Sequence, residues 1–140
     1  MGELLMTADE LSSFLASHMP DGSRRFVVEE ASGDGLRMRS VYDDSQLRPG
    51  GSVSGPTMMS LADAAAWLVT LSRIGPVALA VTSSLNIAFL RKPGPADLVA
   101  HATLLRLGRR QSVSEVRIWS DGTDPRDPVA HATVTYAIPR

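Results

Sequence analysis

The stretch 54–67, SGPTMMSLADAAAW, decides how this chain folds. Nearly every residue after Pro56 is apolar and a good helix former, and a helix that is apolar on all sides is normally buried. Asp63 stands in the middle of this run. Because burying an unpaired carboxylate costs on the order of several kcal/mol, the acid needs either a structural partner or a chemical role.

The patterns on either side of this stretch predict an α+β fold. A Pro in the first turn and a Gly-Pro pair at 75–76 place the central helix at about 56–72, and a capping-box pattern begins a shorter helix at 7–20. Alternating apolar and polar residues predict strands at 24–32, 35–44, 77–92, 97–108, 111–122 and 128–139. A sheet that curls around one central helix is the natural way to bury that helix in a chain of this size. We expect a single domain over residues 1–140.

The alternation in the strand predicted at 77–92 indicates which way the Thr82 hydroxyl points. Strict alternation places Val81 and Leu85 on one face and Thr82 on the opposite face. If the apolar face covers the helix, Thr82 points away from Asp63 of its own chain. A two-fold axis beside this strand, or a bulge within it, would bring Thr82 to the helix of a second chain.

Composition excludes several classes of protein. The 140 residues carry a formal net charge of −1 and no cysteine. The balanced charge argues against nucleic acid as a main partner, and the absence of Cys excludes disulfides, thiolate metal sites and cysteine nucleophiles. We expect no membrane span, since the sequence has no apolar run long enough to cross a bilayer. We also expect no signal peptide, since the N-terminus lacks a basic start followed by an apolar run. We therefore expect a cytoplasmic protein, since that location requires no targeting segment.

A repeated AHAT segment raises the possibility of a metal pair. His101 and His131 occupy the same position in its two copies. A third ligand is hard to nominate, because the remaining histidine, His18, lies in the first predicted helix. Histidines that make hydrogen bonds within the sheet are the favoured interpretation, and we expect no metal.

Two interpretations of Asp63 remain open from local pattern alone. The structural one is an ion pair with an Arg or a hydrogen bond to Ser60. The chemical one is a catalytic carboxylate in a pocket near the start of the helix. Gly55 precedes the helix, where unpaired N–H groups and the helix dipole would stabilise an oxyanion about two turns from the acid.

At this point the chain resembles a known family. The runs 48–67, 77–110 and 128–137 resemble the hotdog-fold thioesterases of the phenylacetate-degradation type, and the resemblance extends from about Leu47 to Ile138. SLADAA followed by VTSSLNIAFLRKPG is the specific part of it. The resemblance implies the hotdog fold, in which an antiparallel sheet wraps one long helix. It also implies hydrolysis of acyl-CoA, at least a homodimer with a homotetramer as the favoured assembly, and no cofactor.

By the same resemblance, particular residues take particular roles. Asp63 corresponds to the acid that attacks the thioester carbonyl or activates water, and Gly55 to the residue whose N–H polarises that carbonyl. Thr82 falls where the family often has a hydroxyl that reaches the site from the neighbouring subunit. The sequence alone leaves open whether Asp63 is a general base or a nucleophile.

The approach to the helix departs from the family pattern. The family commonly has Asn-x-x-Gly-x-x-His-Gly-Gly, and here Arg48 replaces the Asn, Ser54 replaces the His and Pro56 removes one N–H. We keep Ser54 in the catalytic set and Arg48 in the substrate-binding set. Arg48 paired with Asp63 is the alternative, which would make the acid structural.

The substrate-binding residues follow from basic and glycine-containing turns. The resemblance implies that coenzyme A is bound near two turns, by Arg91, Lys92, Gly108, Arg109, Arg110 and Ser112. The alternative is that each of these residues simply belongs to a solvated turn. Met58, Met59 and Trp67 offer an apolar wall, or simply core. A non-catalytic hotdog protein that binds acyl-CoA as a sensor or carrier is the alternative function, and the changed 48–54 segment is what favours it.

Overall fold

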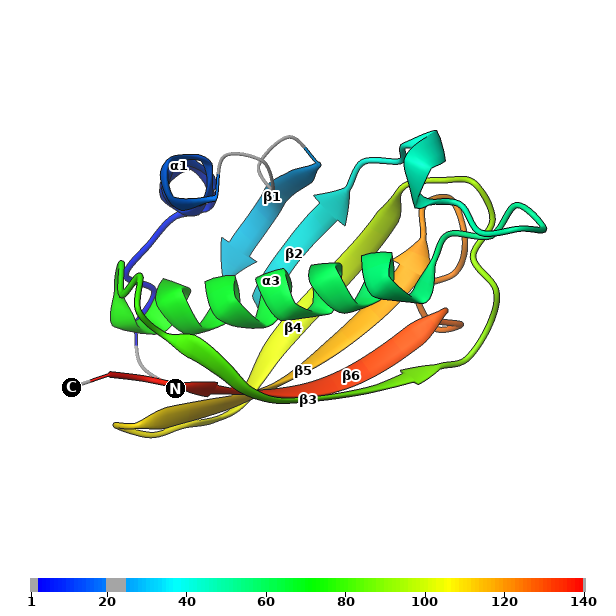
Figure 1. The fold of residues 1–140 in the computed structure, drawn as a ribbon. Coiled ribbons are helices and arrows are strands. Elements are labelled where there is room, and N and C mark those ends of the chain that lie inside the picture. Colours follow the sequence, from blue (N-terminus) through cyan, green and yellow to red (C-terminus); the bar gives the residue numbers. More distant parts are fainter. Residues whose placement is uncertain (1–2, 20–24, 140) are drawn as a thin grey trace.

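The computed structural model describes residues 3–19 and 25–139, and its long helix lies across a curved antiparallel sheet (Figure 1). Its elements are α1 (Ala8–His18), β1 (Phe26–Ser32), β2 (Gly35–Ser40), the short 3-10 helix η1 (Asp44–Gln46), α3 (Gly55–Ile74), β3 (Val81–Phe89), β4 (Leu98–Leu107), β5 (Gln111–Ser120) and β6 (Ala130–Ala137). The hotdog fold is confirmed. The predicted end of the first helix at Pro20 lies outside the described residues.

The sheet has six strands in the order β1-β2-β4-β5-β6-β3, and each neighbouring pair is antiparallel. Strands β1 and β3 are therefore its two edges. Figure 1 shows α3 running along the concave side of the sheet, with α1 above it beside β1. This arrangement leaves one face of α3 covered by the sheet and the opposite face turned toward α1.

Local sequence explains where α3 begins, ends and packs. Ser54 caps its N-terminus by accepting a hydrogen bond from the N–H of Thr57, and Pro56 occupies the first turn. Gly75 ends it at φ 93°, a backbone angle that side chains disfavour. Small and aliphatic side chains bury one face completely, which allows close approach to the sheet: Leu61, Ala62, Ala65, Ala66, Leu68 and Leu71.

Strand β3 differs from its prediction in both start and phase. It begins at Val81, and its register with β6 shifts between Thr82 and Ser84, which marks a β-bulge. Thr82 pairs with Tyr136 and Leu85 pairs with Val134, so both lie on the inner face despite being three residues apart. The expectation that Thr82 points away from its own helix was wrong, because the bulge reverses the alternation.

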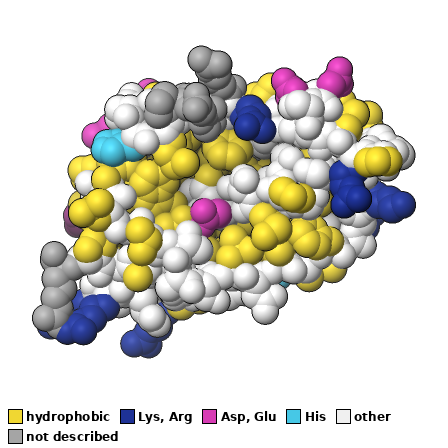
Figure 2. Space-filling view, in the orientation of Figure 1, with side chains coloured by type: hydrophobic (Ala, Val, Ile, Leu, Met, Phe, Trp, Pro, Cys, Tyr) yellow, Lys and Arg dark blue, Asp and Glu magenta, His cyan; other side chains and the backbone are white. Residues whose placement is uncertain are grey.

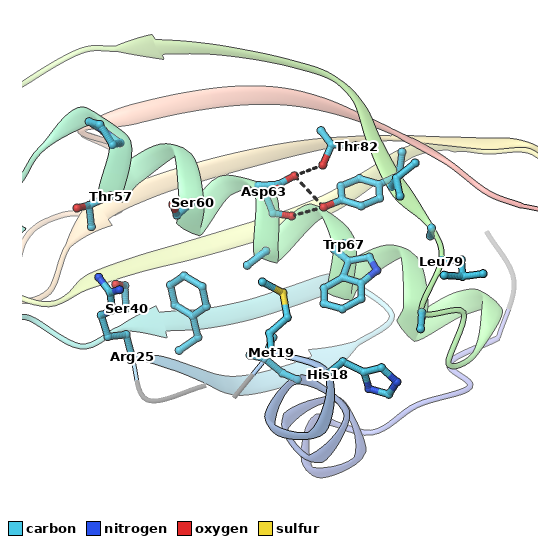
Figure 3. A pocket seen from close by; sticks show the side chains of 18 of the residues that line it. His18, Met19, Arg25, Ser40, Thr57, Ser60, Asp63, Trp67, Leu79 and Thr82 are labelled. Atoms are coloured by element: carbon cyan, nitrogen blue, oxygen red, sulfur yellow. Dashed lines mark hydrogen bonds between the residues drawn. The ribbon is translucent and has the colours of Figure 1, made fainter. Parts of the chain in front are cut away.

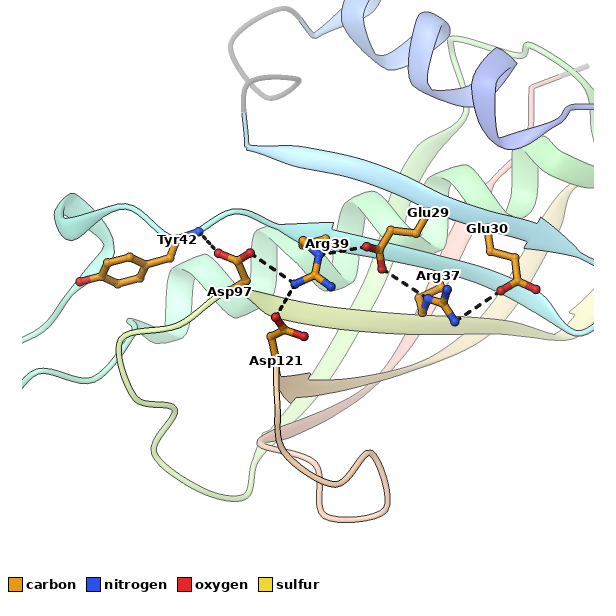
Figure 4. A network of polar contacts seen from close by, with 7 residues as sticks. All are labelled: Glu29, Glu30, Arg37, Arg39, Tyr42, Asp97 and Asp121. Atoms are coloured by element: carbon orange, nitrogen blue, oxygen red, sulfur yellow. Dashed lines mark hydrogen bonds and ion pairs between the residues drawn. The ribbon is translucent and has the colours of Figure 1, made fainter.

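A network of charged side chains joins the strands at the other edge of the sheet (Figure 4). Arg39 on β2 contacts Glu29 of β1 at 3.0 Å, Asp97 before β4 at 3.3 Å and Asp121 after β5 at 2.9 Å. These hydrogen bonds with acidic side chains raise the pKa of Arg39, led by the bond with Asp121. The guanidinium is therefore a permanent cation that holds three segments together.

The two histidines of the repeated segment do not share a site in this structure. Arg117 of β5 lies between them in the sheet register, with His101 of β4 on one side and His131 of β6 on the other. His131 Nε2 lies 2.6 Å from an oxygen of Glu115. In the parts of the chain that the structure describes, no group of three or more His, Cys, Asp or Glu is placed to hold a metal ion. None of the helices described is long and apolar enough to cross a membrane.

Candidate active site

Asp63 is held by two hydroxyl groups from neighbouring strands (Figure 3). Its Oδ1 accepts a hydrogen bond from Thr82 Oγ1 of β3 at 2.6 Å and another from Tyr136 Oη of β6 at 2.7 Å. The Tyr136 hydroxyl also lies 3.1 Å from the backbone carbonyl oxygen of Asp63. The bulge in β3 makes this arrangement possible, because it turns Thr82 inward beside Tyr136.

The two carboxylate oxygens of Asp63 are thus in different situations. Oδ1 has two donors, whereas Oδ2 has no hydrogen-bond partner among residues 3–19 and 25–139. A carboxylate with one oxygen fixed and the other free is suited to take a proton from water or to attack an electrophile. This geometry favours the chemical interpretation of the acid.

Tyr136 was not predicted as a site residue. It is buried, and burial together with the neighbouring Asp63 carboxylate raises the pKa of its phenol well above the usual range. The phenol therefore stays protonated and remains a hydrogen-bond donor to the carboxylate. In the sequence, Tyr136 is indistinguishable from the other inward-facing residues of an alternating strand. Only the register of β3 and β6, which pairs Tyr136 with Thr82, shows that its hydroxyl lies beside Asp63.

Asp63 lies in the wall of a cavity of about 890 Å³. The cavity lies between α1 and α3, and its other walls come from the start of β1, the end of β2, Gln46 of η1, the segment 78–82 and Tyr136 of β6. Its lining is mainly apolar, and the ionisable side chains that line it, besides the phenol of Tyr136, are Asp63, His18 and Arg25. A volume of this size suits a small-molecule ligand.

Figure 2 shows the same feature from outside, as one acidic side chain over the middle of α3 with apolar side chains on both sides. One apolar area lies between α1 and α3, where the cavity opens. The other lies between α3 and β3 at the edge of the sheet. An acidic side chain in such surroundings is a candidate for function, since a purely structural acid is usually paired with a cation.

The structural alternatives for Asp63 are not found. In the part of the chain that the structure describes, neither Ser60 nor Arg48 makes a hydrogen bond or an ion pair with it. Arg48 is exposed on the loop before α3. The partners of Asp63 are hydroxyls, which orient its side chain without pairing it with a cation.

Gly55 and Ser54 lie at the start of α3, away from the acid. Gly55 is eight residues before Asp63, which separates their backbones by about 12 Å at 1.5 Å per residue. Its N–H has no hydrogen-bond partner among the described residues, as is usual in a first helical turn. The Ser54 hydroxyl is engaged in the helix cap, 2.8 Å from Thr57 Oγ1.

The residues predicted to bind coenzyme A do not line the cavity of this chain. Arg91 pairs with Asp127. The exposed Arg109 and Arg110 occupy the turn between β4 and β5, where the N–H of Gly108 donates to the carbonyl of Gln111. Lys92 is exposed after β3.

The remaining predicted binding residues are Ser112 and the apolar set Met58, Met59 and Trp67, and two of these four, Ser112 and Met58, lie in the core. Ser112 is fully buried with its Oγ 2.7 Å from Thr70 Oγ1, so its hydroxyl belongs to the core of this chain. It faces α3 because it pairs with Tyr136 on the inner side of the sheet. Met58 is core, Met59 is exposed outside the cavity, and Trp67 alone of the three lines it.

A curved antiparallel sheet around one long helix is the hotdog fold, and here the helix carries a hydroxyl-bound acid beside a cavity. The sequence model described as the thioesterase superfamily matches residues 50–125. The chain belongs to this family. A protein of Halobacterium salinarum that is provisionally named an esterase is 33% identical in an alignment of 120 positions, and the match covers 79% of each chain.

Solved structures agree with this membership. A crystal structure from Silicibacter sp. TM1040, provisionally named a thioesterase, has a TM-score of 0.90 at 38% identity, over 99% of this chain and 95% of that one. A mutant structure of the phenylacetic acid degradation protein PaaI of Thermus thermophilus has a TM-score of 0.72 at 24% identity, over 86% and 99% of the two chains. The second likeness supports the fold alone.

Proposed function

We propose that this protein hydrolyses acyl-CoA thioesters to the free acid and CoA, as a hotdog thioesterase of the phenylacetate-degradation type, with Asp63 as general base or nucleophile. The observation that carries the proposal is Asp63 itself, fixed through Oδ1 by Thr82 and Tyr136 in the wall of a cavity. Membership of the thioesterase superfamily supplies the reaction class.

The chemistry of Asp63 can follow either of two balanced routes. As a base, its free oxygen takes a proton from water while the water oxygen adds to the thioester carbonyl; the C–S bond then breaks and the thiolate leaves with a proton. As a nucleophile, the carboxylate adds to the carbonyl and expels the thiolate, and water hydrolyses the resulting anhydride. Both routes place negative charge on the carbonyl oxygen, so both need a donor there.

Gly55 is the proposed donor, and the geometry favours its action from a second copy of the chain. An N–H about 12 Å along the same helix is too far from Asp63 for both to meet one carbonyl group. Strand β3 is an open edge of the sheet, so it is available to pair with another chain. Exposed apolar residues on and near it, which a partner would cover, are Met59, Leu79, Val81, Phe89 and Leu90.

Two-fold symmetry determines what such a pairing brings together. Two copies of β3 related by a two-fold axis run antiparallel, so the start of one strand lies beside the end of the other. Thr82 marks the start, next to Asp63. Phe89 marks the end, next to Gly55, because a Cβ added at Gly55 would lie 3.4 Å from the Phe89 ring. We therefore propose a homodimer in which Asp63 and Thr82 of one copy face Gly55 of the other.

In the proposed dimer, the residues predicted to bind coenzyme A would lie near the start of β3. Arg91 and Lys92 follow Phe89, so those of the second copy approach the start of β3 in the first. Arg109 and Arg110 of the first copy lie at the corresponding end of the sheet, since Gln111, Ala137 and Val81 form one rung across β5, β6 and β3. These cations suit the phosphates of CoA. Association of two such dimers into a homotetramer remains a prediction that rests on the family resemblance.

One observation favours a second candidate, a protein that binds acyl-CoA without hydrolysing it. The loop before α3 places Arg48 on the surface and uses Ser54 as a helix cap. Neither side chain contacts Asp63 in the described structure. If catalysis requires a group at either position, the cavity would bind its ligand and leave it intact.

Release of free thiol from a panel of acyl-CoA thioesters separates these functions. We expect turnover by the wild type and a loss of about 100-fold or more in Asp63→Asn, because the amide keeps the shape but cannot act as base or nucleophile. An unchanged thermal melt would show that the variant is folded. Binding of acyl-CoA with no thiol release from any member of the panel would overturn hydrolysis and establish the binding protein.

A further inference from the structure

The cavity beside Asp63 has a polar end near the start of α3 (Figure 3). Thr57 and Ser60 of α3 lie on one side of this end, and Ser40 and Arg25 lie on the other. The lining of the cavity as a whole is mainly apolar. Hydroxyl groups and a cation at one end therefore call for an explanation that packing does not supply.

Gln46 brings a buried hydrogen-bond donor to the same end. Its side chain lines the cavity, and its backbone carbonyl accepts a hydrogen bond from the N–H of Ser54, the N-cap residue of α3, at 2.8 Å. Its Oε1 accepts from the N–H of Asp43 at 3.1 Å, so the remaining polar atom of the amide is Nε2, which can only donate. Gln46 is 5% exposed, and Nε2 has no hydrogen-bond partner in the described structure.

Ser40 has the same deficit. It is 2% exposed on the inner side of β2, and its Oγ has no partner in the part of the chain that the structure describes. Burying a polar atom without a partner costs free energy, so such an atom in a native protein points to an unseen partner such as a ligand or water. Two of them at one end of a cavity indicate a ligand with an acceptor group.

The charges at this end favour an anion. Arg25 adds a permanent cation, and the positive end of the α3 dipole lies on the same side. Asp43, the acid beside Gln46, uses its carboxylate to accept from the N–H of Ser45 at 2.8 Å. Because Arg25 and Gln46 Nε2 donate and cannot accept, the ligand group that matches them is a carboxylate.

The proposed dimer gives the direction in which an acyl group would extend. It places the cations for CoA near the start of β3, which lies toward Leu79 and the end of α3. CoA and the acyl group leave a thioester carbonyl on opposite sides. With the carbonyl at Asp63, the acyl group points toward the start of α3, where Thr57 lies six residues, or about 9 Å along the helix, from the acid.

We infer that the end of the cavity formed by Arg25, Ser40 and Gln46, named here the carboxylate subsite, binds a second carboxylate carried by the acyl group of the substrate. The substrates would then be mono-CoA thioesters of dicarboxylic acids. The inference rests on the proposed function, which places the thioester carbonyl at Asp63. An extended chain spans about 9 Å in roughly seven bonds, since three backbone bonds span at most about 3.6 Å, and suberyl-CoA has an acyl chain of this length.

Two substrates of equal length test this selectivity. Suberyl-CoA and octanoyl-CoA differ in the terminal group, which is a carboxylate in the first and a methyl in the second. We expect kcat/KM of the wild type to favour suberyl-CoA by about tenfold or more, because hydrogen bonds to a charged group are the stronger kind. Equal values of kcat/KM, or a preference for octanoyl-CoA, would overturn the inference.

Gln46→Glu removes the buried donor with little change of shape. The glutamate keeps an oxygen for the N–H of Asp43 and puts an acceptor in place of Nε2. We expect the preference for suberyl-CoA to fall by about tenfold or more. Ser40→Ala removes the second unpartnered atom at no cost in folding and should lower the preference as well.

The opposite end of the cavity supplies a matched control. Trp67 Nε1 is also buried without a partner in the described structure, and Trp67→Phe removes it. This variant should keep the preference for suberyl-CoA. Loss of the preference in Trp67→Phe, with Gln46→Glu and Ser40→Ala unaffected, would place the carboxylate at the other end and overturn the inference.

Arg25→Gln distinguishes an acyl carboxylate from the phosphates of CoA as the anion bound. We expect a lower kcat/KM for suberyl-CoA than for octanoyl-CoA relative to wild type, and the same pattern with the two pantetheine thioesters, which lack the nucleotide. Arg117→Gln is the control, since this exposed arginine of β5 does not line the cavity. Equal losses for both acyl groups in Arg25→Gln would overturn the carboxylate subsite.

Binding to Asp63→Asn separates failure of this inference from failure of the proposed function. Calorimetric titration of this variant with the two CoA esters measures selectivity without turnover. Selective binding of suberyl-CoA, by a protein whose wild type hydrolyses neither ester, would overturn hydrolysis and support the carboxylate subsite. Equal binding of the two esters, together with their hydrolysis by the wild type, would overturn the carboxylate subsite and leave the proposed function in place.

Discussion

Tyr136 helps to orient Asp63, because its phenol reaches the carboxylate from a buried position and stays protonated. Tyr136→Phe removes only this hydroxyl. We expect kcat to fall by about 10- to 100-fold with KM little changed, since the acid would lose its orientation and the substrate no contact. Steady-state kinetics with an acyl-CoA that the wild type hydrolyses measures both constants, and a thermal melt checks folding.

Thr82 supplies the control for this prediction. Thr82→Ser keeps a hydroxyl beside Asp63 and should retain most activity, whereas the isosteric Thr82→Val should resemble Tyr136→Phe. Rescue by Ser, but not by Val, is a result that a purely structural contribution would not produce. A rise in KM at constant kcat in Tyr136→Phe would contradict its role in positioning the acid.

At the scale of elements, Arg39 connects the strands at the edge of the sheet opposite β3. Its ion pairs with Glu29, Asp97 and Asp121 join β1, β2 and the segments that flank β4 and β5. Arg39→Met keeps the aliphatic stem and leaves three acidic side chains without their cation. We expect the free energy of unfolding to fall by about 2–3 kcal/mol, measured by urea denaturation.

Arg37 is the matched control for that loss. Its side chain is 44% exposed and contacts Glu29 at 3.3 Å and Glu30 at 3.4 Å. Exposed pairs of this kind contribute about 0–1 kcal/mol, so Arg37→Met should cost clearly less than Arg39→Met. Equal losses in the two variants would show that the network adds nothing beyond ordinary surface pairs.

At the scale of the whole molecule, the proposed active site is divided between two chains. Gly55→Pro tests the donor, because it removes an N–H that has no partner in the described chain, and the extended Ser54 backbone at ψ 154° accommodates a following proline. We expect kcat to fall about 100-fold or more in Gly55→Pro. Gly55→Ala, which keeps the N–H and whose Cβ would make an ordinary contact with Phe89, should be mild.

Mixing two inactive variants then shows which chain supplies each residue. In a hybrid of Gly55→Pro and Asp63→Asn, one shared site carries both changes and the other carries neither. Refolding equal amounts makes half of the dimers hybrid, so about a quarter of all sites should regain activity. No recovery, with hybrids confirmed by native mass spectrometry, would mean that the active site does not combine Asp63 of one copy with Gly55 of the other.

Local sequence determined the elements and the reactive residue of this protein. The helix at 55–74 and the strands around it follow from apolar periodicity, Pro, Gly and capping residues, which act within a few positions of the chain. Asp63 was identifiable for the same reason: an acid in an apolar helix is conspicuous without any knowledge of its neighbours. The order of these elements indicated a sheet around one central helix, and the family resemblance implied the hotdog fold.

Contacts between distant strands decided what surrounds Asp63. The bulge that turns Thr82 inward, the Tyr136 phenol beside it and the burial of Ser112 all depend on the register of β3, β5 and β6. Register is set by pairing along whole strands, and one extra residue moves a side chain to the other face. Sequence periodicity therefore located the acid, and only the tertiary structure could show which hydroxyls hold it.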